Sequence, residues 1–81
     1  MNRQYSGAWY SSSIVKDNTE GFIGYDLVRI KEGCQNRIAR ILYWDACGQF
    51  SVETLGSDVP LEILEALIAE AKSIPGTGSL P

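Results

Sequence analysis

The chain has 81 residues, 44% of them hydrophobic, and a formal net charge of -3, which together indicate one small acidic globular domain. A domain of this size buries only about 60% of its unfolded surface, so its core is thin and a large internal ligand cavity is not expected. The acidic balance also argues against a dedicated nucleic-acid binder, because such proteins are usually basic.

The sequence contains no apolar run suited to a secretory signal, and none approaches the roughly 18 apolar residues of a membrane span. We therefore expect a soluble, cytoplasmic protein. Cys34 and Cys47 flank an expected strand and are 13 positions apart. An extended strand of that length holds its ends roughly 40 Å apart, whereas a disulfide needs Cα atoms within about 7 Å. Free thiols fit a reducing compartment.

The first 19 residues are polar around a small aromatic island that includes Trp9 and Tyr10. They form either an irregular N-terminal segment or an additional strand around residues 8–15. Residues 16–21 have the composition of a loop.

Residues 22–31 are rich in β-forming side chains, but their apolar residues occur at both odd and even positions. The strand is therefore apolar on both faces, or a bulge switches its face midway, with Gly24 as the candidate position. Glu32 and Gly33 are typical of a hairpin turn that leads into the next strand.

A second strand over residues 37–46 is also apolar on both sides, as expected for a central strand. Strand alternation places Ile38, Leu42 and Trp44 on one face and Ala39, Ile41 and Tyr43 on the other. The sequence from Asp45 to Gly48 then fits a type I turn followed by a left-handed glycine, which is the three-residue hairpin pattern.

Residues 49–55 alternate as an edge strand does, with Phe50, Val52 and Thr54 on the expected buried face. Pro60 suits the first position of a helix that ends before Pro75, and Ser57 or Asp58 could cap its start. Its expected apolar stripe comprises Leu61, Leu64, Leu67, Ile68, Ala71 and Ile74. Residues 75–81 are expected to form a flexible tail.

The order of elements predicts a single α+β domain over residues 1–81. It is a small two-layer domain, with a three- to four-stranded antiparallel meander and one C-terminal helix packed on one face. One helix covers only one face of such a sheet. The other face must be covered by the N-terminal segment, by a second copy of the chain or by a different protein.

Catalytic signals are weak. The chain has no histidine, and its two cysteines lack a metal-binding or redox spacing. Glu62 and Glu65 belong to the side of the expected helix that faces solvent. Lys31 and Arg37 could lower the pKa of Cys34, but an ordinary thiol at a hairpin tip is the simpler interpretation. We therefore expect a protein that is not an enzyme and that uses no cofactor and no metal.

Asp26 interrupts an apolar strand, so it either faces solvent or pairs across the sheet with Arg40 or Arg37. Four of the seven basic residues fall within twelve positions, near aromatic residues that could stack on a ligand. A basic hairpin of this kind could bind single-stranded nucleic acid, could meet an acidic protein surface, or could simply be solvated. Its members are Arg29, Lys31, Arg37 and Arg40.

Protein–protein interaction through a sheet face, with the chain acting as a homodimer, is the function that these features favour. Aromatic residues would supply buried area, and arginines would bind carboxylates. The expected partner-binding residues are Trp9, Tyr10, Arg29, Arg37, Arg40 and Tyr43. The alternatives are nucleic-acid binding by the basic hairpin, or a small-molecule site at a dimer interface lined by Trp9, Tyr25 and Trp44.

Overall fold

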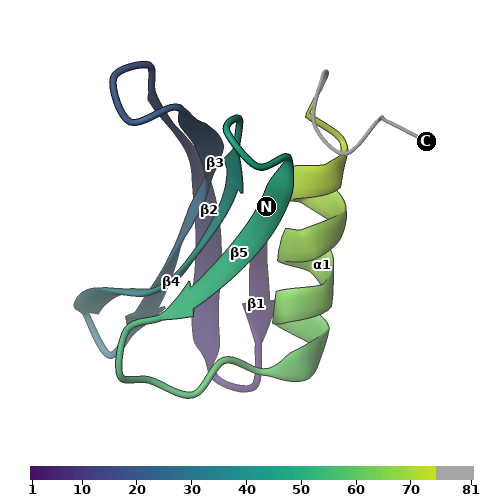
Figure 1. Cartoon of the computed structure of the whole chain (residues 1–81). Helices are drawn as coiled ribbons and strands as arrows, with labels where there is room; N and C mark the ends of the chain where they lie inside the picture. Colours follow the sequence, from purple (N-terminus) through teal and green to yellow (C-terminus); the bar gives the residue numbers. More distant parts are fainter. Residues whose placement is uncertain (75–81) are drawn as a thin grey trace.

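The computed structural model describes residues 1–74 and has the predicted α+β architecture. Its strands are β1 (Asn2–Tyr5), β2 (Ala8–Asp17), β3 (Phe22–Lys31), β4 (Cys34–Trp44) and β5 (Gln49–Thr54), followed by the helix α1 (Leu61–Lys72). The strands form one antiparallel meander in the order β1-β2-β3-β4-β5. The helix lies along one face of the curved sheet (Figure 1). The tail predicted at 75–81 lies outside the described residues.

The N-terminal segment extends the sheet, which confirms the additional strand. It forms two strands, β1 and β2, joined by Ser6 and Gly7 with φ values of 50° and 82°. Positive φ at both central residues is typical of a type I′ hairpin turn. The segment therefore does not fold across the uncovered face of the sheet, which was one of the expected ways to cover it.

Two further hairpin turns follow the sequence prediction in part. Glu32 and Gly33 have φ values of 51° and 78° and join β3 to β4 as expected. Gly48 is left-handed, with φ of 63°, and its N–H donates to the Trp44 carbonyl at 2.8 Å. Since Trp44 pairs with Gln49, this loop has four residues rather than the three predicted.

The irregularity of the sheet lies in β4, not at Gly24. Leu27 pairs with Ala39, and Val28 pairs with Arg37, so Ile38 is the extra residue. This bulge turns Ile38 into the same core as Ala39, and both side chains are fully buried. The prediction that Ile38 shares a face with Leu42 was therefore wrong, because simple alternation ignores the bulge.

The core lies between α1 and the sheet. Ile63, Leu67 and Ala71 are fully buried on the helix and pack against strand residues that include Leu27 and Ile41. Burying a leucine or isoleucine side chain contributes about 1.5–3 kcal/mol, so a few such residues decide the stability of so small a domain.

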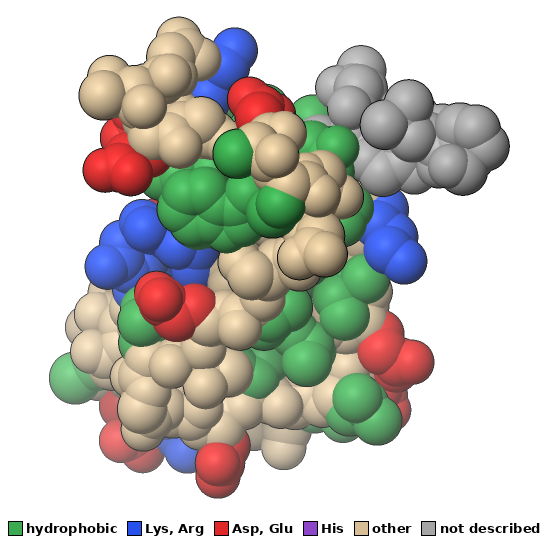
Figure 2. All heavy atoms as spheres, in the orientation of Figure 1, with side chains coloured by type: hydrophobic (Ala, Val, Ile, Leu, Met, Phe, Trp, Pro, Cys, Tyr) green, Lys and Arg blue, Asp and Glu red, His purple; other side chains and the backbone are tan. Residues whose placement is uncertain are grey.

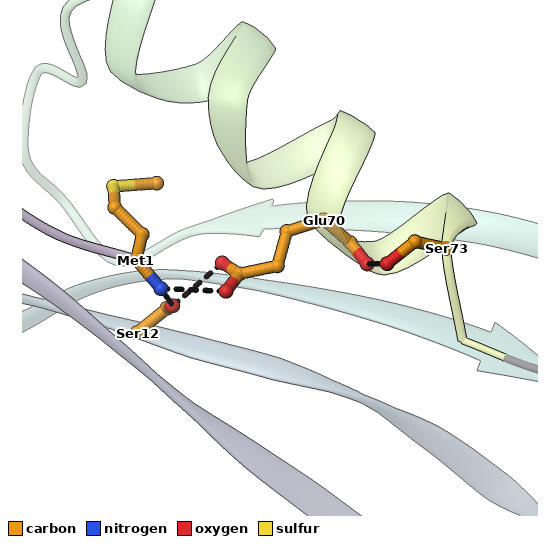
Figure 3. A network of polar contacts seen from close by, with 4 residues as sticks. All are labelled: Met1, Ser12, Glu70 and Ser73. Atoms are coloured by element: carbon orange, nitrogen blue, oxygen red, sulfur yellow. Dashed lines mark hydrogen bonds and ion pairs between the residues drawn. The ribbon is translucent and has the colours of Figure 1, made fainter.

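The helix is rotated and shifted relative to its prediction. Ile63 occupies the centre of the buried face, whereas Leu61 is 70% exposed. Pro60 is the N-cap residue and not the first helical residue, and no side chain caps this end, so the predicted caps are absent from α1. At the other end, the Ser73 hydroxyl donates to the Glu70 carbonyl at 2.6 Å (Figure 3).

A polar network ties α1 to the N-terminal hairpin (Figure 3). The Met1 ammonium group lies 2.5 Å from Oε2 of Glu70, and the Ser12 hydroxyl donates to Oε1 of Glu70 at 2.6 Å. Glu70 is thus half-buried. The network fixes the side of α1 that faces β2.

Candidate interaction surface

The sheet face opposite α1, here called the open face, is the candidate site. Directly opposed residues of antiparallel strands share a face, so the register assigns its members. Asp26 pairs with Arg40, and Phe22 pairs with Trp44. The rest of the face is assigned by the same alternation, and within residues 1–74 no other element lies over it. Its main members are Trp9, Phe22, Asp26, Val28, Ile30, Arg37, Arg40, Leu42 and Trp44.

One end of the open face is an aromatic cluster. The rings of Phe22 and Trp44 meet edge to face with centroids 5.2 Å apart. The indole N–H of Trp44 donates to the Ser51 hydroxyl at 3.0 Å, which fixes the ring across β4 and β5. Leu42 lies beside the cluster but is only 7% exposed, so the apolar surface at this end is formed mainly by Phe22 and Trp44.

The centre of the open face is an ion-pair cluster. Nε of Arg40 donates to Oδ1 of Asp26 at 2.7 Å, and Arg37 approaches the other carboxylate oxygen at 3.4 Å. Of the two alternatives that the sequence left open for Asp26, the structure shows the pairing across the sheet. Partial burial acts to raise the pKa of Asp26, but the hydrogen bond and charge of Arg40, aided by Arg37, hold that pKa below its ordinary value.

The two arginines differ in what they can still bind. The hydrogen bond from Arg40 to Asp26 raises the pKa of Arg40, and the carboxylate of Glu53 on β5 adds to the effect. The side chain of Arg37 is 49% exposed, compared with 26% for Arg40. Arg37 therefore keeps donors available for a second carboxylate, whereas Arg40 mainly holds Asp26 in place.

The other end of the open face carries Trp9, which is 41% exposed. Its indole N–H donates to the Asn2 side-chain oxygen on β1. Ile30 pairs with Trp9 and is half-buried, as is Val28 on the same face. The open face is thus apolar at both ends and charged at its centre.

The structure brings only three of the six predicted partner-binding residues onto this face, namely Trp9, Arg37 and Arg40. Tyr10 and Tyr43 are 3% and 7% exposed and lie on the α1 side, so their prediction as surface residues needs correction. Large aromatic side chains of a thin core are buried in the same way, and sequence alone did not separate the two roles.

Arg29 also lies on the α1 side of the sheet, where it donates to the Asp58 carbonyl at 3.3 Å. Lys31 has the same parity as Arg29 in β3. The four residues of the basic hairpin therefore divide between the two faces, and Arg37 and Arg40 both contact Asp26. The basic hairpin therefore does not present its four basic residues on one surface.

The residues proposed to line a small-molecule site are also separated. Trp9 and Trp44 lie at opposite ends of the open face, and Tyr25 points to the α1 side. No pocket was found in the part of the chain that the structure describes.

Cys34 and Cys47 are exposed and free, which confirms that they form no intrachain bridge. Among the described side chains, no group of three or more His, Cys, Asp or Glu residues could hold a metal ion. Within residues 1–74, no helix is both long and apolar enough to cross a membrane.

Sequence reasoning missed Phe22 and Leu42 as members of the site. The hairpin turn at Glu32 and Gly33 could not have found them, although a two-residue turn fixes the initial register of β3 against β4. The bulge at Ile38 shifts that register by one residue, so counting from the turn alone would have paired the wrong residues beyond it.

Comparison of the chain with models of known protein families, with curated proteins and with solved structures gave no match.

Proposed function

We propose that this protein is a small non-enzymatic interaction protein that binds another protein through the open face and acts as a homodimer. The observation that carries the proposal is the composition of that face, which is apolar at both ends, charged at its centre and left uncovered by the other described elements. Aromatic residues and arginine beside one another on an uncovered face are typical of a protein interface. The proposed location is the cytoplasm, where Cys34 and Cys47 would stay reduced.

The aromatic residues supply the binding energy in this proposal. Trp9 and Trp44 are each held by a hydrogen bond from the indole nitrogen, so little conformational entropy is lost when a partner covers them. Tryptophan and arginine are the residues most often found at the energetic centres of interfaces. Trp44, backed by Phe22, is the expected anchor.

The charged centre selects the partner. Asp26 neutralises Arg40, whereas the half-exposed guanidinium of Arg37 makes only one long contact, at 3.4 Å. A carboxylate on the partner would therefore bind Arg37, and apolar side chains beside it would pack on Trp44 and Phe22. The occupant is a protein segment that carries an acidic residue next to apolar residues.

Nucleic acid is a weaker candidate for the same face. Its two arginines are partly neutralised by Asp26 and by Glu53, and the chain as a whole has a formal net charge of -3. Phosphate binding draws on uncompensated positive charge, which this face has in only a small amount.

Selection from a phage-displayed library of random peptides tests the proposal. The immobilised full chain should enrich peptides that combine Asp or Glu with aromatic or aliphatic residues. Binding of these peptides should fall at least about tenfold in the Arg37→Glu and Trp44→Ser variants, as expected for central interface residues. The matched control is Ile14→Ser, which removes a side chain that is 59% exposed on the other side of the sheet.

A failure to enrich any peptide family would contradict the proposal. So would enrichment of peptides that bind Arg37→Glu and Trp44→Ser as tightly as they bind the unmodified protein. Circular dichroism of each variant shows whether it is folded. Arg37 is exposed, so its replacement is expected to leave the fold intact.

A further inference from the structure

Within residues 1–74, the edge strand β5 and the neighbouring side of α1 form a second surface that no other element covers. In the meander β5 pairs with β4 on one side only. The Leu55 N–H donates to the Ile38 carbonyl at 3.0 Å, toward β4. Backbone N–H and C=O groups alternate in direction along an antiparallel strand. The N–H and C=O groups of Phe50, Val52 and Thr54 therefore point away from β4. These residues form the docking edge of the molecule.

The same region holds much of the exposed apolar surface. Five large hydrophobic side chains of the described residues are exposed, and three of them are Val52 at 44%, Leu55 at 37% and Leu61 at 70%. Figure 2 shows hydrophobic side chains gathered between β5 and α1. The prediction of a buried inner face for β5 was therefore wrong, because Val52 and Thr54 are exposed there.

The position of α1 explains this exposure. The helix packs chiefly on β3 and β4, and the ion pair between Glu70 and Met1 fixes its other flank on the N-terminal hairpin. The flank that carries Leu64 and Ile68 is therefore turned toward β5 and is only half-buried. An apolar surface remains along Phe50, Val52, Leu61, Leu64 and Ile68.

Strand β5 has few of the features that protect an edge, and Glu53 is its single charged residue. The strand spans six residues, Gln49–Thr54, and contains no proline, no lysine and no register shift. The opposite edge, β1, has only four residues and includes Arg3. Natural sheets use short strands and charges to prevent unwanted pairing at edges, so the shorter β1 is better protected than β5, whose single charge points to the open face.

We propose that β5 pairs antiparallel with β5 of a second copy, around a two-fold axis at Val52. Paired residues must share a face, so Val52 meets the partner's Val52 and Phe50 meets the partner's Thr54. On the open face, Glu53 then lies opposite the partner's Ser51 and not opposite its own copy. This register joins apolar residues and avoids a pair of like charges.

The two-fold axis is perpendicular to the sheet, so both helices lie on the same side of one continuous sheet of ten strands, five from each copy. The Leu61, Leu64 and Ile68 flanks of the two helices face each other above the paired Val52 residues. A dimer of this kind covers the exposed apolar surface and adds to a thin core. Symmetric self-pairing fits a surface whose own residues complement one another.

If the open face binds a partner as proposed, the dimer presents two such faces. Both open faces lie on the side of the joined sheet that is opposite the helices, so they form one platform with two binding sites. A partner with two acidic–apolar segments would then bind more tightly than one segment alone. Pairing through β5 itself does not depend on what the open face binds.

The mass of the full chain in solution, measured by light scattering over a concentration series, tests the dimer. The unmodified protein should reach twice the chain mass of 8.9 kDa. Val52→Lys places a charge at the two-fold axis. Val52→Pro removes a backbone N–H that points away from β4. Both variants keep the hydrogen bonds between β5 and β4. Each should weaken the dimer at least about tenfold.

Two control variants separate this dimer from one formed elsewhere. Ile14→Lys puts the same charge on another exposed residue of the sheet, and Trp44→Ser alters the open face. Both should remain dimeric. A monomer at every concentration would overturn the proposal, as would a dimer that resists Val52→Lys but is lost in Trp44→Ser. Failure of the peptide selection would refute the proposed function and leave these masses unchanged.

Discussion

Gly24 lies so close to β4 that a Cβ atom built on it would be 1.8 Å from the carbonyl oxygen of Ile41. The glycine is buried and pairs with Leu42, in the middle of the sheet. Since the obstacle is backbone, no rotamer change can relieve the collision. The close approach of β3 and β4 therefore depends on glycine at this position.

Gly24→Ala should accordingly lower the free energy of unfolding by about 3 kcal/mol or prevent folding, as overpacking against a rigid backbone does. Urea denaturation followed by circular dichroism measures the change. Gly21→Ala is the matched control, because it has φ of 81° and nothing within 4 Å of the added atom. The control should lose only about 1 kcal/mol, from backbone strain. Equal losses in both variants would contradict this view of the β3–β4 contact.

The ion-pair cluster at Asp26 should make stability depend on pH. The pKa of Asp26 is lowered in the folded state, so its charged form adds stability that is fully present above the unfolded pKa, near 3.8. That contribution is lost as the pH falls through the lower folded pKa. We expect Asp26→Asn to lose about 1–2 kcal/mol at pH 7, and the difference from the unmodified protein should shrink below about pH 4.

Urea titrations at several pH values check this dependence, with the exposed Glu20→Gln as control. The control should differ from the unmodified protein by less than about 0.5 kcal/mol at neutral pH. A gap between Asp26→Asn and the unmodified protein that is constant from pH 7 to pH 3 would show that the carboxylate charge does not stabilise the fold.

The contact between α1 and the N-terminal hairpin should be sensitive to Glu70. Its carboxylate binds both the Met1 ammonium group and the Ser12 hydroxyl, and it is half-buried. Glu70→Gln should lower the free energy of unfolding by about 1–3 kcal/mol, because a charged hydrogen-bond acceptor is lost where water does not fully replace it. Chemical denaturation provides the measurement. If the exposed Glu65→Gln is equally damaging, the network is not what holds the helix.

The rotation of α1 predicts opposite outcomes for two leucines. Leu67 is fully buried, whereas Leu61 is 70% exposed. Leu67→Ala should cost about 2–5 kcal/mol, and Leu61→Ala should cost less than about 1 kcal/mol in the monomer. Thermal and urea unfolding at low protein concentration compare them. Similar losses of stability in the two variants would mean that α1 turns the predicted stripe, which includes Leu61, toward the sheet.

The elements with strong local signals were predictable. Alternation and turn chemistry gave β3, β4 and β5, and the paired Pro75 and Gly76 marked the end of a helical pattern. The first strand was missed, although Ser6 and Gly7 are a common turn pair, because the residues before them are polar. The face of α1 could not be fixed, since apolar residues cover a wide arc of the helix and periodicity does not choose its centre.

The site was less predictable than the fold because it depends on register. The isolation of an acid in an apolar strand suggested the pairing of Asp26 with Arg40 or Arg37 as one alternative, beside simple exposure to solvent. The burial of Tyr10 and Tyr43 was not, since an aromatic residue in a strand has the same local sequence signal on either face. Arg29 was assigned to the wrong cluster because nearness in sequence was used in place of strand parity.

Acrylamide quenching of tryptophan fluorescence tests the central claim most directly, because both tryptophans of the chain lie on the open face. A saturating amount of a selected acidic–apolar peptide should shield Trp9 and Trp44, shift their emission to the blue and reduce quenching. Raising the protein concentration alone should change neither the emission wavelength nor the quenching, since pairing through β5 leaves the open face uncovered. Quenching that stays the same when the peptide is bound would contradict binding at the open face.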